Sequence, residues 1–333
     1  MITLGWASPA TIDPLLLLLV ALAVDAYVGE MSFLFRVVPH PVVAMGRAID
    51  WLERRLNRAE RGAAALRIRG ALSIAALCLA GIVIGTPLVW FSRHYPMGWL
   101  VELFLLITLV AQRSLYDHVN LVYRTLRDEG LYAGRQAVSR IVGRDPAALD
   151  EHGVARAAIE SCAENFSDGV VAPVFWYVLF GLPGLLVYKI VNTADSMIGH
   201  PSPRYADFGK AAARLDDAMN LIPARLSGVL LAIAACFAPT ANPAGAFATM
   251  WRDAGKHRSP NAGWPEAAMA GALGVALAGP RRYAERTVED PWIGNGRARA
   301  LPEDIRRALV VFGIACLVHW ALIAALLVLR LRA

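Results

Sequence analysis

Four long apolar runs limit what this chain can fold into more than any other feature of its sequence. They cover residues 15–28, 72–91, 100–111 and 308–329. The first and the last approach the roughly 20 residues that a helix needs to cross a bilayer. Strand patterns are nearly absent, and a helix satisfies its own backbone hydrogen bonds in lipid. We therefore predict an all-α, polytopic membrane helix bundle with cytoplasmic helices and loops.

Two further apolar runs, residues 170–187 and 226–238, are weaker because proline and glycine interrupt or bound them. Broken apolar segments are tolerated at membrane depth where they pack against protein or line a cavity. A straight crossing by residues 170–187 would put the polar residues on its two sides on opposite faces of the membrane. We therefore predict that this segment is re-entrant or packed within the bundle, and that both polar blocks are cytoplasmic. Some helices of the bundle are expected to be broken or re-entrant.

Arginine placement predicts the orientation. Arginines crowd residues 47–69 and 113–144, whereas the short segment 92–98 carries one, so the first two are expected inside and the third outside. The net charge of +6 is explained by this orientation and by contact with anionic headgroups of the lipid bilayer. No basic stripe interleaves with aromatic residues, which argues against nucleic-acid binding.

The expected location is a bacterial cytoplasmic membrane, crossed several times by a single unit over residues 1–333. Helical regions are expected at 121–163 and 202–223, and irregular loops at 251–265 and 283–302. The polar regions expected in the cytoplasm are approximately 36–69, 113–168, 199–225, 251–265 and 281–307.

The stretch from residue 160 to residue 225 concentrates ionisable groups beside an apolar run, which is the usual mark of a functional site in a membrane protein. Glu160 and Glu164 are four residues apart, so they share a helix face, and Asp168 follows one turn later. Such carboxylates suit a magnesium ion that also binds substrate phosphates. The alternative is a solvated helix face on which Arg156 pairs with Glu160.

Two more polar stripes follow. Asn192, Asp195, Ser196 and Gly199 fall on one helical face, and Lys189 lies one turn earlier. Asp216, Asp217 and Asn220 form the next group, for which the alternative is an ordinary polar helix end before Pro223.

The loop at 251–265 contains Lys256, His257, Ser259 and Asn261. Its glycines and prolines would let backbone amides point at an anion. His257 is a candidate general base, and the alternative is a solvent-exposed histidine without a role. His40 has the same two alternatives. The chain has three lysines against thirty arginines, and each lysine lies in a motif-like segment.

Several familiar motifs are absent from the sequence. There is no GxxxxGK[ST] phosphate loop, no GxGxxG, no GxSxG elbow and no HExxH. The four cysteines are scattered and lack zinc spacing, so they are interpreted as small buried apolar residues.

Six blocks of sequence together resemble the CobD/CbiB family of membrane cobinamide (adenosylcobinamide-phosphate) synthases. They are HPVVAMGR at 40–47, VSRIVGRD at 138–145, AAIESCAENFSDGVVAPVF at 157–175, YKIVNTADSMIGH at 188–200, RLDDAMNLIPARL at 214–226 and RDAGKHRSPNAGWPEAAMAGALG at 252–274. The resemblance implies an amide ligase of cobalamin biosynthesis, which joins aminopropanol or its O-phosphate to a propionate carboxylate of cobyric acid. It also implies ATP and Mg²⁺.

With this reaction in view we assign roles to the polar residues. The predicted catalytic residues are Glu160, Glu164, Asp195, Lys189 and His257. The predicted metal ligands are Glu164, Asp168, Asp195, Asp216 and Asp217. The predicted substrate- or phosphate-binding residues are His40, Arg47, Arg140, Arg144, Asn165, Asn192, Ser196, Arg204, Tyr205, Arg225, Lys256, Ser259 and Asn261.

Two other classes of function stay open. A transporter of a small polar or corrinoid solute would also place charge beside broken helices, but it predicts a pseudo-repeat between halves that is not visible. A scaffold would explain the bundle but not the carboxylate stripes. A homo-oligomer, or an assembly with other corrin-pathway enzymes, is also left open.

Overall fold

The computed structural model describes residues 12–29, 35, 39–58, 60–143, 146–282, 287–288 and 290–332. Among these residues, five helical segments are long and apolar enough to cross a membrane. They are Ala63–His94, Trp99–Asp128, Glu151–Gly199, Lys210–Ala234 and Pro302–Arg332. The prediction of an all-α polytopic bundle is therefore confirmed.

The chain divides into two compact units, each assembled from separate stretches of sequence. The first unit comprises Met1–Ala111, Ala172–Asn220 and Ile323–Ala333, and the second comprises Gln112–Val171 and Leu221–Leu322. Two helices, α9 (Lys210–Ala234) and α12 (Pro302–Arg332), contribute residues to both. The single unit expected over residues 1–333 stays a prediction.

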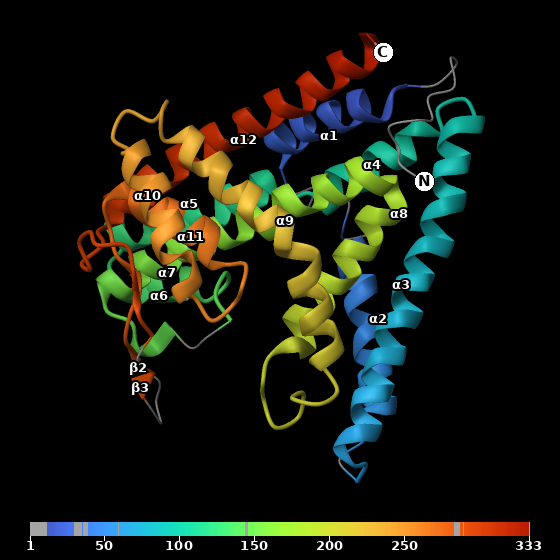
Figure 1. The fold of residues 1–333 in the computed structure, drawn as a ribbon, viewed down its shortest axis with the longest axis horizontal. Helices are drawn as coiled ribbons and strands as arrows, with labels where there is room; N and C mark the ends of the chain where they lie inside the picture. Colours follow the sequence, from blue (N-terminus) through green and yellow to red (C-terminus); the bar gives the residue numbers. More distant parts are fainter. Residues whose placement is uncertain are drawn as a thin grey trace. The chain divides into compact units, whose positions relative to one another are not determined.

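In the first unit, α1 (Pro14–Val28) packs against α4 (Trp99–Leu109), while α2 (Pro41–Leu56) and α8 (Ala172–Ala194) pack against α3 (Ala63–His94). Figure 1 shows α2 running beside the N-terminal half of α3. A proline at the first helical position begins both α1 and α2, where its missing N–H costs nothing.

Helix α8 is broken, as its sequence predicts. Gly181 has φ 66° and leaves the helical region, and Pro183 follows it. Ala172 before the break and Tyr188 and Val191 after it belong to one buried cluster with Met219. A straight helix would separate Ala172 from Val191 by about 28 Å. The chain therefore folds back at Gly181, which confirms the prediction of a broken segment.

Glycines on α3 let two segments approach it closely: the part of α8 after Gly181, and the loop that follows α8. A Cβ on Gly85 would lie 2.8 Å from Pro183 Cα, and one on Gly70 would overlap the carbonyl oxygen of Phe208. Ile74, Ala194, Ile198 and Phe208 then share one buried core. This core fixes the segment after α8 near the N-terminal half of α3.

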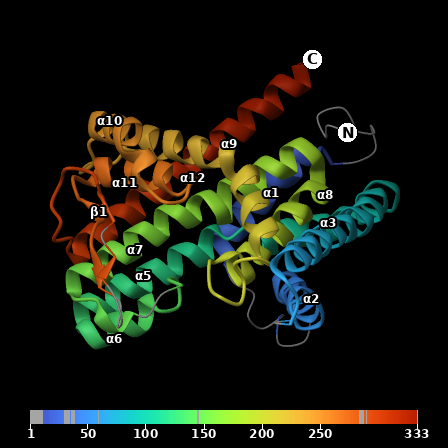
Figure 2. The same cartoon turned by 60° about the horizontal axis from the view of Figure 1, so that its bottom comes forward.

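The second unit is built from α5 (Gln112–Asp128), α6 (Leu131–Val138), α7 (Glu151–Phe166), α10 (Pro243–Asp253) and α11 (Gly263–Leu273). Helix α5 is amphipathic and buries the apolar residues of one face against α6 and α7. Helices α10 and α11 lie side by side in Figure 2.

Two pairs of two-residue antiparallel strands complete the second unit. β1 (Leu277–Ala278) pairs with β4 (Trp292–Ile293), and β2 (Arg281–Arg282) pairs with β3 (Thr287–Val288). The first pair brings the turn after Ile293 close to α10, which matters for the site described below.

Two sequence-based boundaries were wrong. Residues 202–209 form turns, and the helix expected at 202–223 begins at Lys210. The stretch 251–265 is not all loop, because α10 continues to Asp253, a 3₁₀ turn η6 (Ala254–Lys256) follows, and α11 starts at Gly263. In the second segment, packing of α10 against α11 extends both helices into the expected loop.

Candidate functional site

Two polar clusters that include predicted site residues are present, one in each unit. The first, which we call the aspartate–amide cluster, consists of Tyr188, Asn192, Asp195, Asp216 and Asn220. The second, the Asp253 cluster, consists of Arg252, Asp253, Lys256 and Gly294.

Hydrogen bonds fix one carboxylate of the aspartate–amide cluster in place. Asp216 is only 8% exposed. Asn220 donates to its Oδ2 at 2.9 Å, and Asn192 donates to its Oδ1 at 3.4 Å. The Tyr188 hydroxyl donates to Asn220 Oδ1 at 3.0 Å and so fixes the orientation of that amide. Residues from α8 and α9 that are 24 to 32 positions apart are thereby tied together.

A second carboxylate lies near the first. Asp195 and Asp216 are close enough to repel each other electrostatically, and Asp217 acts on both. Asp195 begins a π-helical turn, η5 (Asp195–Gly199), a form that often occurs at functional sites. A Cβ on Gly199 would overlap Asp195 Oδ1, so the glycine leaves room for the carboxylate. Two like charges held together on largely apolar helices are costly unless a cation joins them.

The other residues predicted on this stripe take less central positions. Lys189 is buried on α8, one turn before Asn192. Ser196 donates its hydroxyl to the Asn192 carbonyl at 2.9 Å, which is a local helix contact. Asp217 is half-buried.

Arg204 ties the loop after η5 to α2. Its Nε and Nη2 donate to the two oxygens of Glu53 at 2.8 and 2.9 Å. Glu53 is 3% exposed. Burial alone would raise the pKa of Glu53, but hydrogen bonds from Arg204 and Asn57 and the charge of Arg204 outweigh it and leave that pKa below its usual value. Arg204 was predicted to bind phosphate, and in the structure it pairs with Glu53. The ring of Tyr205 lies beneath its guanidinium.

The N-terminal candidates lie on α2. His40 caps the helix, because its Nδ1 accepts the backbone N–H of Val42 at 3.2 Å. Arg47 is exposed on the same helix.

In the second unit the Asp253 cluster surrounds a carboxylate with 0% exposure. Arg252 donates to both oxygens at 2.8 and 2.7 Å, Lys256 Nζ lies 2.8 Å from Oδ1, and the Gly294 N–H donates to Oδ2 at 2.8 Å. Hydrogen bonds from Arg252, then from Lys256 and Gly294, hold the pKa of Asp253 well below its usual value despite burial. The carboxylate thus fixes two partly exposed cations at the end of α10.

The loop that follows brings four predicted residues together. Ser259 N–H donates to His257 Nδ1 at 3.0 Å, and Ser259 Oγ accepts the N–H of Asn261 at 3.2 Å. Asn261 Oδ1 accepts from Arg225 Nη1 at 3.1 Å, and the Arg225 guanidinium lies over the Trp264 ring. Sequence separation between Arg225 and Asn261 is 36 residues, so only the fold brings them together.

His257 is constrained at both ring nitrogens. Its Nε2 lies 3.7 Å from Oε1 of the buried Glu266. Since Nδ1 accepts a backbone hydrogen bond, the proton of the neutral ring belongs on Nε2, facing this carboxylate. To act as a base at Nδ1 the ring would first have to break the bond from Ser259.

The acidic residues predicted on one helix face belong to α7 and to the π-helical turn η4 (Ser167–Val171), and they lie in different environments. Glu160 is buried and accepts the N–H of Ala278 at 2.8 Å, so it supports strand β1. Glu164 is exposed and Asp168 is half-buried. Asn165 donates to the Ser161 carbonyl at 2.9 Å.

Arg156, considered above as a partner of Glu160, also makes contacts in the segment 292–298. Arg156 donates to the Ala298 carbonyl and lies over the Trp292 ring. Arg140 is exposed after α6, and the prediction for Arg144 falls outside the described residues.

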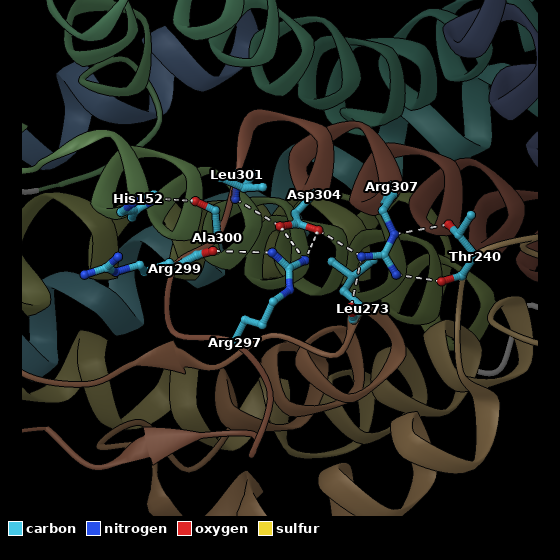
Figure 3. A network of polar contacts seen from close by, with 9 residues as sticks. All are labelled: His152, Thr240, Leu273, Arg297, Arg299, Ala300, Leu301, Asp304 and Arg307. Carbon is cyan, nitrogen blue, oxygen red and sulfur yellow. Dashed lines mark hydrogen bonds and ion pairs between the residues drawn. The ribbon is translucent and has the colours of Figure 1, made fainter.

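Sequence reasoning missed a network at the start of α12, shown in Figure 3. Asp304 is 2% exposed and accepts from Arg297 at 3.0 Å, from Arg307 at 2.8 Å and from the N–H of Leu301 at 2.9 Å. Arg307 also donates to the carbonyls of Leu273 and Thr240. The sequence feature that could have indicated this network is an aspartate in the first helical turn after Pro302. The network secures the loop that carries Gly294.

The predicted metal site needs several oxygen donors close to one another. Within the described ranges, no three His, Cys, Asp or Glu side chains gather closely enough to hold a metal ion by themselves. Magnesium usually takes only one or two protein carboxylates together with substrate phosphates and water. Asp195 and Asp216 supply such a pair, and the metal assignment stays a prediction.

Comparisons with known proteins agree with one another. The family described as CobD/Cbib protein matches residues 18–312. A Cobalamin biosynthesis protein CobD from Rhizobium meliloti (strain 1021) is 52% identical over 305 residues, covering 91% of this chain and 93% of its own. Proteins of the same name from Brucella suis biovar 1 (strain 1330) and Rhodobacter capsulatus are 50% and 47% identical, and each alignment covers 92% of the relative. No solved structure matches.

Proposed function

The chain belongs to the CobD/CbiB family, and on that premise we propose that it is a multi-pass membrane enzyme of cobalamin biosynthesis that forms an amide bond. The proposed substrates are a propionate carboxylate of cobyric acid and aminopropanol or its O-phosphate. The observation that carries the proposal is the aspartate–amide cluster, in which two neighbouring carboxylates have amide donors fixed around one of them.

The chemistry explains why such a cluster is needed. A carboxylate does not react with an amine near neutral pH until one of its oxygens becomes a leaving group. Transfer of the ATP γ-phosphoryl group to that oxygen provides the leaving group, and attack by the amine then releases phosphate and a proton. Both steps place negative charge on phosphoryl oxygens, which must be stabilised electrostatically.

The donor set fits Mg²⁺. Asp195 and Asp216 present hard oxygen ligands, and their mutual repulsion would be relieved by a divalent cation. When bound, Mg²⁺ would neutralise charge on the phosphates of ATP.

The residues around this pair have positioning roles in the proposal. Asn192 and Asn220 hold Asp216 in one rotamer, and Tyr188 prevents the Asn220 amide from turning over. Gly199 leaves the space that Asp195 occupies. These contacts keep the carboxylates in place without supplying positive charge, which leaves their charge for a cation.

Lys256 and Arg252 are the proposed anion-binding groups of the second unit. Both are partly exposed, and both are held by the buried Asp253, so they are oriented before an anion arrives. Three charges, two positive and one negative, leave the cluster with a net charge of about +1. A phosphate or a corrin carboxylate is a suitable partner for it.

Activity of the purified protein tests the proposal. Protein in detergent is supplied with cobyric acid, ATP, Mg²⁺ and either amine, and the amide is followed by mass spectrometry. We expect product, and we expect Asp216→Asn to lose at least about tenfold in turnover. The control is Asp207→Asn, which removes an exposed 2.7 Å pair with Arg67 in the same unit and should stay near wild type. No product from folded protein, or full turnover by Asp216→Asn, would contradict the proposal.

We also propose on which side of the membrane the C-terminus lies. If the arginine-rich segment 47–69 is cytoplasmic, α3 leads outward and its turn into α4 lies outside. Ile12 and Pro14 line one cavity with that turn, and Asp13 pairs with Arg330 at 3.2 Å, so the C-terminus lies outside as well. Cysteines placed at 206 and 331 should therefore show opposite accessibility to an impermeant thiol reagent in intact cells.

A further inference from the structure

Two cavities of the first unit share a wall formed by Arg93 and His94, at the C-terminal end of α3. One cavity has a volume of about 630 Å³ and lies between α3 and the break in α8. The other has a volume of about 400 Å³ and lies beneath the turn that joins α3 to α4. Neither includes a residue of the aspartate–amide cluster.

The larger cavity has the chemistry and length of a lipid-tail site. Its walls are almost entirely apolar and include Trp90, Trp176 and Phe180. On α3 it extends from Ile82 to Arg93, which is about 16 Å along the helix axis. Half of the roughly 30 Å hydrocarbon core of a bilayer is about the same length. An acyl chain of one leaflet therefore fits between the headgroup level and the middle of the membrane.

The smaller cavity has a mixed lining, in which apolar residues alternate with polar and charged ones, and Glu102 is the most informative of the charged residues. This carboxylate is 3% exposed and accepts hydrogen bonds from Ser92 Oγ at 2.6 Å and from the Tyr177 hydroxyl at 2.8 Å. In the described part of the chain, no Arg, Lys or His pairs with it. Two hydroxyl donors alone are weak compensation for a buried carboxylate, so a cation is the expected further partner.

Arg93 lies between the two cavities and supplies the opposite charge. A guanidinium is well suited to a phosphate, and a ligand that spans both cavities would place its phosphate there. The required ligand then has an apolar tail, a phosphate next to the tail and an ammonium beyond the phosphate.

We propose that this end of the first unit binds one phospholipid whose headgroup bears a primary ammonium. The acyl chain lies along α3 against the break in α8, the phosphate contacts Arg93, and the ammonium pairs with Glu102. The inference does not depend on the proposed amide ligase activity, because neither cavity includes a residue of the aspartate–amide cluster. The lipid would also cover the non-helical backbone at Gly181, which lines the larger cavity.

Native mass spectrometry of the delipidated protein tests the proposal. The probes are phosphatidylethanolamine, phosphatidylglycerol and phosphatidylcholine of identical acyl chains, titrated one at a time. We expect phosphatidylethanolamine to bind about tenfold tighter than phosphatidylglycerol, which lacks the ammonium. It should also exceed phosphatidylcholine, whose methylated ammonium cannot donate a hydrogen bond. Equal binding of the three lipids to the wild type would overturn the proposal.

Variants separate the two halves of the site. Glu102→Gln should abolish the preference while leaving phosphatidylglycerol binding unchanged, and Arg93→Gln should weaken both lipids. Val89→Trp, which fills the larger cavity without touching a charge, should reduce binding of all three and remains informative if Glu102→Gln fails to fold. Glu129→Gln, at an exposed site outside both cavities, is the control. An unchanged preference in folded Glu102→Gln, or undiminished binding by Val89→Trp, would contradict the assignment.

Discussion

Replacing Asp253 by asparagine tests the idea that a buried carboxylate fixes the cations at the end of α10. The substitution keeps the shape of the side chain but replaces one acceptor oxygen by an NH₂ group. Each oxygen now accepts from two donors: Oδ1 from Arg252 Nε and Lys256, and Oδ2 from Arg252 Nη2 and Gly294. Whichever way the amide turns, two donors lose their acceptor.

The expected cost follows from those two losses. A hydrogen bond to a charged group contributes about 1.5–3 kcal/mol when fully buried. Arg252 and Lys256 are 45% and 40% exposed, so water can replace part of what each loses. We therefore expect Asp253→Asn to lower the free energy of unfolding by about 2–4 kcal/mol in all. In the functional assay it should raise the KM of the phosphorylated substrate, because Lys256 is no longer fixed.

Thermal unfolding in detergent measures this cost against a matched control. Asp290 pairs with Arg258 at 2.7 Å in the same unit, and that arginine is 68% exposed. Asp290→Asn should cost at most about 1 kcal/mol. Equal melting temperatures for Asp253→Asn and the wild type, or an equal loss in both variants, would refute the reasoning.

The same network predicts a pH dependence. The pKa of Asp253 is lower in the folded protein than the value of about 3.9 of the unfolded chain. Its contribution is therefore fully present above that unfolded value and is lost as the pH falls through the folded value. The difference between wild type and Asp253→Asn should be constant from pH 8 to pH 5, and a difference that shrinks in this interval would count against the assignment.

Three further substitutions test contacts in the first unit. Gly199→Ala should push aside the Asp195 carboxylate and lower turnover at least about tenfold, with a melting temperature close to wild type; unchanged turnover would argue against a role for this carboxylate. Arg204→Gln and Glu53→Gln should each destabilise by about 1–3 kcal/mol, and a double-mutant cycle in chemical unfolding should show the two costs to be non-additive. Gly70→Ala should lower the melting temperature by several degrees, because its methyl group meets the backbone of the loop after η5, and an unaffected melting temperature would mean that this approach is not close.

Local sequence pattern determined the fold class and the position of the polar stripes. Hydropathy identifies spanning helices because an uninterrupted apolar run has no other stable state in lipid. The break in α8 was equally local, since Gly181 and Pro183 cannot continue a regular helix. The neighbouring positions of Asp216 and Asn220 followed from a spacing of four residues, and the hydrogen bond between them is observed.

Tertiary structure decided the environment of each polar residue and which distant residues it contacts. Glu160 and Glu164 have the same spacing as a ligand pair, yet one is buried against strand β1 and the other is exposed. Arg204 meets Glu53 across 151 positions, and Asp253 meets Gly294 across 41. The sequence alone determined which residues share a helix face, because helical periodicity depends only on near neighbours. It could not determine which buried charges are neutralised, because that depends on helices and loops that pack together from distant parts of the chain.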